Sequence, residues 1–269
     1  LLGRCAGIAF SVDEDALMLA ARSVSIAVPG RTLVDNLALE VKSGECWAVL
    51  GCNGSGKSSL LLALAGLRRP SAGRVELRGR PIDAWPRRTL AQRLGILLQD
   101  EPADYWGSTL DYILLGRYPR SRTAYSEDPA ARDEALALLE EVDLAVHAPQ
   151  PYRTLSGGER QRARLAQVFM QDPECLLLDE PLQHLDLKHQ LGVMQALARR
   201  AAGGRAVLMA LHEPAMAARV CDNAVLLYDS GRVRQGRIAE MLTQDNLEQL
   251  YQCRLEPAGG PDAKVFVPR

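Results

Sequence analysis

Residues 51–58 read Gly-Cys-Asn-Gly-Ser-Gly-Lys-Ser and fit the pattern G-x-x-x-x-G-K-[ST]. They follow an apolar run at residues 46–50 and precede a helical pattern at residues 59–66. A glycine-rich turn can join many strands to helices, but here strand, loop and helix stand in the order that a phosphate-binding loop requires. Glycines let backbone N–H groups converge on phosphates, and the helix N-terminus adds a partial positive charge. The stretch therefore predicts a phosphate-binding loop.

Within this loop, Lys57 is expected to reach the β and γ phosphates of a nucleotide, and Ser58 a bound Mg²⁺. The residues expected to surround the phosphates are Gly51, Asn53, Gly54, Ser55, Gly56, Lys57, Ser58 and Ser59.

Apolar runs recur on either side of the loop, at residues 46–50, 74–77, 95–98, 175–178, 206–211 and 224–228. Their nearly continuous hydrophobicity indicates strands that are covered on both faces, hence a largely parallel sheet in an α/β fold. Between residues 99 and 155 the apolar residues are instead spaced as in helices, in two segments at 109–117 and 126–142. In the second, Ser126 to Pro129 is a plausible helix start. This part predicts a small helical insertion.

Composition narrows the class of protein. The 269 residues carry a net charge of −1, which gives no support for a nucleic-acid partner. The six cysteines form no C-x-x-C pair, so we expect reduced core residues rather than a metal site. No run approaches the roughly 18 to 20 apolar residues of a membrane-spanning helix.

A second candidate element is the segment 174–180, an apolar strand that ends in Asp179 and Glu180. Acidic residues can simply end a strand, but ligands of open α/β sheets bind at this edge. On that hypothesis Asp179 holds Mg²⁺ through water, and Glu180 polarises the attacking water as general base.

A third element reads Leu-Ser-Gly-Gly-Glu at residues 155–159, ahead of a helical pattern. Ser156 and Glu159 fit a capping box, which explains them locally. Two consecutive glycines, Gly157 and Gly158, weaken a first helical turn unless something must approach the backbone closely. A phosphate is the natural candidate.

With these three motifs in this order, the chain from about Met18 to Gln244 resembles the nucleotide-binding subunits of ABC transporters. The resemblance implies a P-loop (RecA-like) core with a mainly parallel sheet, an N-terminal antiparallel β subdomain and an inserted helical subdomain. It implies ATP and Mg²⁺ as ligands. It also implies a homodimer, because in that family Ser156, Gly157 and Gly158 would close on ATP held by the other subunit.

Further positions match that family individually. Gln99 resembles the glutamine that contacts Mg²⁺ and links the core to the insertion, although an amide at a strand end is common. His212, after the predicted strand 206–211, resembles the histidine that touches the γ-phosphate, and Asp186 resembles the D-loop aspartate. The catalytic residues implied are Glu180, His212, Gln99 and Lys57, and the metal ligands are Ser58, Gln99 and Asp179. The other histidines, His147, His184 and His189, are expected on the surface or in turns.

Two positions depart from the family pattern. Leu182 stands where Thr or Ser usually follows the proline, and Val28 where an aromatic side chain commonly stacks on adenine. The first departure should matter little. The second predicts weak base recognition and poor discrimination between nucleotides.

Residues 185–190 (LDLKHQ) and 116–119 (GRYP) resemble stretches in importer ATPases for iron-siderophore, haem and cobalamin uptake. This favours a metal-chelate importer, with cobalamin slightly ahead as cargo. The partners implied are a transmembrane permease and, indirectly, a periplasmic substrate-binding protein, with the chain peripheral on the cytoplasmic face of the inner membrane. An exporter ATPase carries the same motifs and stays an alternative; a soluble, non-transport ABC ATPase would need coiled-coil arms or a second ATPase core.

The expected organisation is a disordered N-terminal extension at 1–17, an ATPase domain at 18–246 and a C-terminal tail at 247–269. The core would comprise 18–98 and 173–246, with the helical subdomain at 99–172. Permease contacts are expected at 100–109, where Tyr105 and Trp106 could be exposed anchors or could pack in the core.

Overall fold

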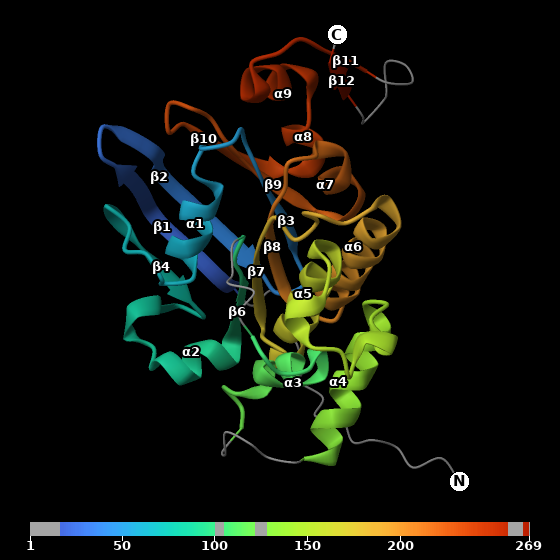
Figure 1. Cartoon of the computed structure of the whole chain (residues 1–269). Coiled ribbons are helices and arrows are strands. Elements are labelled where there is room, and N and C mark those ends of the chain that lie inside the picture. The colour runs from blue at the N-terminus through green and yellow to red at the C-terminus, as the bar shows by residue number, and fades with distance from the viewer. Residues whose placement is uncertain (1–16, 100–104, 122–127, 258–265, 269) are drawn as a thin grey trace.

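The computed structural model of the chain describes residues 17–99, 105–121, 128–257 and 266–268 (Figure 1). The expected extension at 1–17, except its last residue, and most of the tail after Glu256 lie outside these residues.

A six-stranded sheet forms the centre of the fold, in the order β10-β9-β3-β8-β7-β6. All neighbouring strands pair in parallel except the edge strand β10. Every residue of β3, β7 and β8 is buried, as expected of strands covered on both faces. The strands are β3 (Cys46–Leu50), β6 (Leu94–Leu97), β7 (Cys175–Asp179), β8 (Ala206–Ala210), β9 (Asn223–Leu227) and β10 (Val233–Arg237).

A four-stranded antiparallel sheet, in the order β2-β1-β4-β5, packs beside the central sheet. Its strands are β1 (Leu17–Val28), β2 (Arg31–Lys42), β4 (Ala72–Leu77) and β5 (Arg80–Pro81). The apolar run at 74–77 therefore belongs to this sheet, and its assignment to the parallel set was wrong. Two apolar residues, Val75 and Leu77, are too few to distinguish a strand covered on both faces from the buried end of an antiparallel one.

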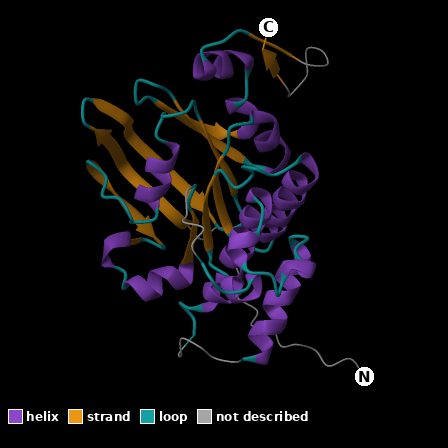
Figure 2. Cartoon of the chain, viewed as in Figure 1, coloured by secondary structure: helices purple, strands orange, loops and turns teal. Residues whose placement is uncertain are grey.

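Alternate residues of the central strands face two different hydrophobic cores. In β3, Trp47 and Val49 face the antiparallel sheet and helix α1 (Lys57–Leu64). Cys46, Ala48 and Leu50 face the helices on the other side. Those helices are α5 (Gly157–Gln171), α6 (Leu187–Ala202), α7 (Pro214–Val220), α8 (Ile238–Met241) and α9 (Gln244–Tyr251). Figure 2 shows the resulting layers, with the central sheet between the antiparallel sheet and these helices. The predicted P-loop α/β fold with its antiparallel β subdomain is confirmed.

The helical insertion has its own small core, at the end of the molecule opposite α9 (Figure 1). It contains α3 (Thr109–Leu114), η2 (Leu115–Arg117), α4 (Pro129–Glu141), η3 (Ala145–His147), η4 (Tyr152–Thr154) and part of α5. Asp128 caps α4 and Pro129 is its first residue, whereas Ser126 lies outside the described residues.

The two aromatic residues expected near the permease have different environments. Tyr105 packs edge-on against Tyr112 and Tyr152, with ring centroids 5.5 and 6.2 Å away. Trp106 is 75% exposed, and the Arg153 guanidinium lies 4.1 Å from its ring centroid. Of the two, Trp106 is therefore the aromatic side chain that is exposed to solvent.

The remaining short elements are η1 (Ile82–Ala84), α2 (Arg87–Arg93), β11 (Leu255–Pro257) and β12 (Phe266–Pro268). Helix α9 runs across residue 246, where the ATPase domain was expected to end, and its Leu247 and Leu250 are buried in the core beneath α7 and β9. Among the described residues, no helix combines the length and apolar character needed to span a membrane.

Candidate functional site

The phosphate loop lies between β3 and α1, as predicted from its flanking sequence. Gly54 and Gly56 have φ values of 77° and 105°, which side-chain-bearing residues rarely adopt. At Gly56 a Cβ atom would also come within 2.9 Å of the Leu33 side chain, so β2 packs directly against the loop. A Cβ at Gly51 would approach Leu227 O to 2.7 Å. These glycines allow the backbone to curl over the start of α1. Asn53 is exposed at the loop's outer edge.

Lys57 occupies the first turn of α1 and is only 5% exposed. Its Nζ donates hydrogen bonds to Gly51 O at 2.9 Å and Cys52 O at 3.2 Å. Burial lowers the pKa of Lys57, against the opposing attraction of Glu180 and Asp179. Two neutral carbonyl oxygens thus hold the Lys57 ammonium over the loop. A bound phosphate would add the negative charge that balances the ammonium.

Asp179 is the last residue of β7 and is 3% exposed. Its Oδ1 is buried and has no hydrogen-bond partner among the described residues, while its carboxylate accepts a hydrogen bond from Ser58. Burial raises the pKa of Asp179, and the charge of Glu180 adds to this effect. A buried carboxylate oxygen without a partner beside a hydroxyl is a suitable environment for a hard cation. The residues present therefore fit Mg²⁺.

Glu180 follows β7 with φ at 51°. Its side chain lies between the side chains of Gln99 and His212, which follow two other strands. Gln99 Nε2, two residues after the end of β6, donates to Glu180 Oε2 at 3.2 Å. His212 Nε2, two residues after β8, lies 2.6 Å from Glu180 Oε1. The structure thus brings together three predicted site residues at the carboxyl edge of the sheet.

The Ser-Gly-Gly segment begins α5. Ser156 caps the helix, and Glu159 completes the capping box through its contact with the Ser156 N–H at 2.7 Å. Ser156 and Gly157 are exposed. At Gly158 a Cβ would come within 2.8 Å of His184 O, so packing within the chain already excludes a side chain there.

Asp186 caps α6 by accepting the His189 N–H at 2.9 Å. The His189 ring lies between two carboxylates, with Nδ1 2.8 Å from Asp186 Oδ1 and Nε2 3.4 Å from Asp143 Oδ2. His189 thereby connects the start of α6 to the helical insertion, a role that the expectation of a surface or turn residue missed. His184 does lie in a turn, and His147 contacts Glu159 at 3.5 Å.

Two residues on α5 support the site without having been predicted. Gln161 is 4% exposed and donates to Glu180 O at 3.2 Å. Arg164 is 8% exposed and donates to Gln99 O at 3.2 Å and to Gln161 Oε1 at 3.0 Å. In the sequence they belong to a run of polar helical residues, which normally indicates a solvent-exposed face. Their partners are distant in sequence, so no local signal identified them.

Val28 ends β1 and is partly buried against the core beside the antiparallel sheet. The alignment of Val28 with the family's adenine-stacking residue stays a prediction. Ser59, also assigned to the nucleotide, accepts a hydrogen bond from Arg68 Nη1 at 2.9 Å.

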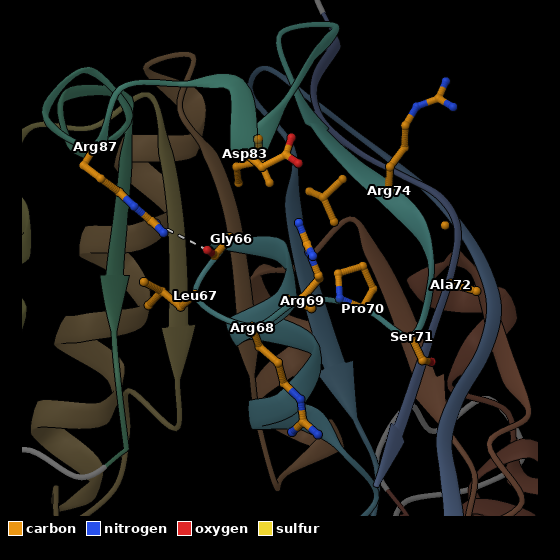
Figure 3. A pocket seen from close by; sticks show the side chains of 14 residues that line it. Gly66, Leu67, Arg68, Arg69, Pro70, Ser71, Ala72, Arg74, Asp83 and Arg87 are labelled. Atoms are coloured by element: carbon orange, nitrogen blue, oxygen red, sulfur yellow. Dashed lines mark hydrogen bonds between the residues drawn. The ribbon is translucent and has the colours of Figure 1, made fainter.

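A pocket of about 470 Å³ opens at the far end of α1, between the 66–75 segment and η1 (Figure 3). Its Arg87 donates to Gly66 O, and Arg68 turns toward Ser59 and Ala27 instead of into the pocket. None of the predicted phosphate or metal residues lines it. The predicted nucleotide-binding loop, residues 51–58, lies at the opposite end of α1.

A phosphate loop on a mainly parallel sheet, with an acidic pair at the end of a buried strand, defines a P-loop nucleoside triphosphatase. Residues 34–183 match the model of the ABC transporter family, and the chain belongs to this family as an ABC-type ATPase.

Curated relatives agree with this assignment. The chain is 37% identical to a hemin import ATP-binding protein, HmuV, of Rhodococcus jostii, over 94% of this chain and 87% of that protein. It is 41% identical to the HmuV of Myxococcus xanthus, over 86% and 88%.

Two solved structures share the fold. A chain from a metal-chelate type ABC transporter in an inward-facing conformation has a TM-score of 0.80 and 25% identity, covering 94% of this chain and 98% of that one. A dimeric ATP-binding cassette in a post-hydrolysis state, bound to ADP and Pi, has a TM-score of 0.73 and 25% identity, covering 82% and 99%.

Proposed function

We propose that this chain hydrolyses ATP to drive an ABC importer for a metal chelate, with haem as the cargo. The observation that carries the enzymatic part is the placement of Glu180 between Gln99 and His212, directly after Asp179. The names of the relatives support haem, in place of the slight preference for cobalamin that the sequence suggested.

In this proposal Glu180 is the general base for the attacking water. His212 and Gln99 hold its two carboxylate oxygens, so that the base is oriented before the nucleotide arrives. Lys57 and the loop N–H groups bind the phosphates. Ser58, Gln99 and Asp179 would hold Mg²⁺, which supplies positive charge to the phosphates.

We further propose that the active site is shared by two copies of the chain. Ser156 and Gly157 are exposed at the start of α5, as needed for contact with a nucleotide held by a second subunit. The similarity to a dimeric cassette supports this arrangement. Asp186 would lie near the same interface.

The permease contact is proposed at the helical subdomain, residues 99–172. Exposed Trp106, stacked under Arg153, is a suitable anchor there. The chain would then be peripheral at the cytoplasmic face of the inner membrane, and a periplasmic binding protein would deliver the cargo to the permease.

The test uses a strain of the source organism that lacks this gene, complemented with the wild type, Glu180→Gln or Glu240→Gln. Glu240 is exposed on α8, so its variant is a matched change of charge. We expect the wild type and Glu240→Gln, but not Glu180→Gln, to restore growth on haem as iron source. Growth on haem without the gene would exclude haem import. A defect confined to a ferric siderophore or to cobalamin-dependent growth would assign that cargo instead, and no uptake defect at all would favour an exporter or a non-transport ATPase.

A further inference from the structure

The C-terminal end of helix α9 lies against the nucleotide site. Leu247 and Leu250, 1% and 3% exposed, pack on the same core as β9 and α7. This packing fixes the last turn of the helix, and the next residue, Gln252, reverses the chain with φ at 54°. Three consecutive residues, Leu250 to Gln252, then contact three different loops.

The first contact reaches the phosphate loop. Cys52 Sγ donates to Leu250 O at 3.1 Å, and it does so from the position next to Gly51. Cys52 O is also one of the two carbonyls that hold Lys57 Nζ. The end of α9 is therefore one hydrogen bond away from the loop segment that holds the phosphate-binding lysine.

The second contact reaches His212. The Tyr251 hydroxyl donates to His212 O at 3.2 Å, while the His212 ring lies against Glu180. Burial raises the pKa of Tyr251, so its hydroxyl stays protonated and remains a donor at neutral pH. Tyr251 restrains the backbone of a residue whose side chain holds the proposed general base.

The third contact reaches the turn after β9. Gln252 Nε2 donates to Asp229 Oδ2 at 2.7 Å, and Asp229 Oδ1 lies 3.2 Å from Arg31 Nη2. Arg31 begins β2, three residues after Val28. Through Asp229, residues 250–252 thus reach the β1–β2 turn, close to Val28, where the adenine of the nucleotide is expected.

We propose that Tyr251 is a positioning residue for ATP hydrolysis, which sets the backbone of His212 while its neighbours fix the phosphate loop and the Asp229 turn. Residues after 246 are then part of the catalytic apparatus and not an appended tail. The inference rests on the proposed role of His212 beside Glu180. It predicts that loss of the Tyr251 hydroxyl affects turnover through His212, and affects nucleotide binding little.

The test compares Tyr251→Phe with Tyr228→Phe in the full-length chain. Tyr228 is buried, at 5% exposure, and its hydroxyl has no hydrogen-bond partner among the described residues. Both variants lose one hydroxyl and keep the ring. Because one hydrogen bond is at stake, we expect Tyr251→Phe to lower kcat for ATP about 3- to 10-fold, with KM within about twofold of wild type. Tyr228→Phe should leave both constants unchanged.

A second arm places Tyr251→Phe in a His212→Ala chain, which keeps the backbone carbonyl but lacks the imidazole. If Tyr251 acts through His212, its replacement should lower kcat no further there. An equal loss of kcat in both backgrounds, or a rise in KM without a fall in kcat, overturns the inference and leaves ATP hydrolysis by Glu180 intact. If His212→Ala itself keeps full turnover, the proposed role of His212 fails and the inference fails with it.

Discussion

Replacing Asp179 by Asn should make the nucleotide-free protein more stable and remove its response to Mg²⁺ and ATP. Asp179 is 3% exposed, and its Oδ1 lacks a partner among the described residues. Its pKa is raised by burial even though Ser58 and Lys57 oppose the shift. A raised pKa in the folded state means that the ionised carboxylate destabilises the fold at neutral pH, and that this penalty disappears as the pH falls through the folded-state pKa.

A buried polar atom without a partner costs about 1 to 3 kcal/mol. In Asp179→Asn a buried polar atom still lacks a partner, so the gain comes from removing the buried negative charge, and we take the lower end of this range for it. We therefore expect a gain of about 1 kcal/mol in the free energy of unfolding, or a rise of roughly 2 to 4 °C in Tm. With ATP and Mg²⁺ at about 100 times Kd, the wild type should gain about 2.7 kcal/mol, and the variant only a small part of that.

Thermal unfolding is measured with no ligand, with ATP and Mg²⁺, and with ATP and EDTA. It gives the Tm of each free protein and the rise in Tm that ATP and Mg²⁺ produce in the wild type and in the variant. Asp133→Asn, an exposed position on α4, is the matched control and should behave as the wild type. A lower Tm of Asp179→Asn without ligand, or an unchanged shift with ATP and Mg²⁺, would refute the assignment of Asp179 to the metal.

Three further predictions concern turnover and nucleotide binding. Glu180→Gln should still bind ATP, lose at least about 10²-fold in kcat and accumulate as an ATP-bound dimer in size-exclusion chromatography; near-normal turnover contradicts its role as base. Val28 leaves most affinity to the triphosphate, so GTP should be hydrolysed within about tenfold of ATP and Val28→Tyr should lower KM for ATP, because stacking contributes about 1 to 3 kcal/mol. Strong ATP preference in the parent, unchanged in the variant, rejects that alignment. Mixed Lys57→Ala and Ser156→Arg chains should form dimers with one undamaged composite site, and nucleotide occupancy no higher than in either variant alone excludes a shared site.

The strand, loop and helix around residues 51–58 could be predicted from sequence because a local motif and a continuous apolar run coincide there. Strand β1 gave a weaker signal, since Ser23 with φ at 52° and a register shift between Ala21 and Val24 interrupt its alternation. Edge strand β10, with the sequence VRQGR, is too polar to be recognised at all.

The site itself was predictable only as far as motifs extend. The side chains of Glu180 and His212 follow buried strands, so their meeting at one sheet edge could be expected. Gln161 and Tyr251 contact backbone carbonyls of distant loops, and nothing in the identity of either residue indicates such a partner. The tertiary packing of α5 and α9 determines those contacts, and this packing cannot be read from a sequence pattern.

The close approach of Gly158 to His184 O has a mechanical consequence. A Cβ at Gly158 would come within 2.8 Å of His184 O, so the first turn of α5 packs closely on residues 184 and 185. We therefore expect the two segments to move together in any rotation of the helical subdomain. If the helical subdomain contacts the permease as proposed, a displacement there would be transmitted to Ser156–Gly158 and to Asp186 together, without a separate relay between them.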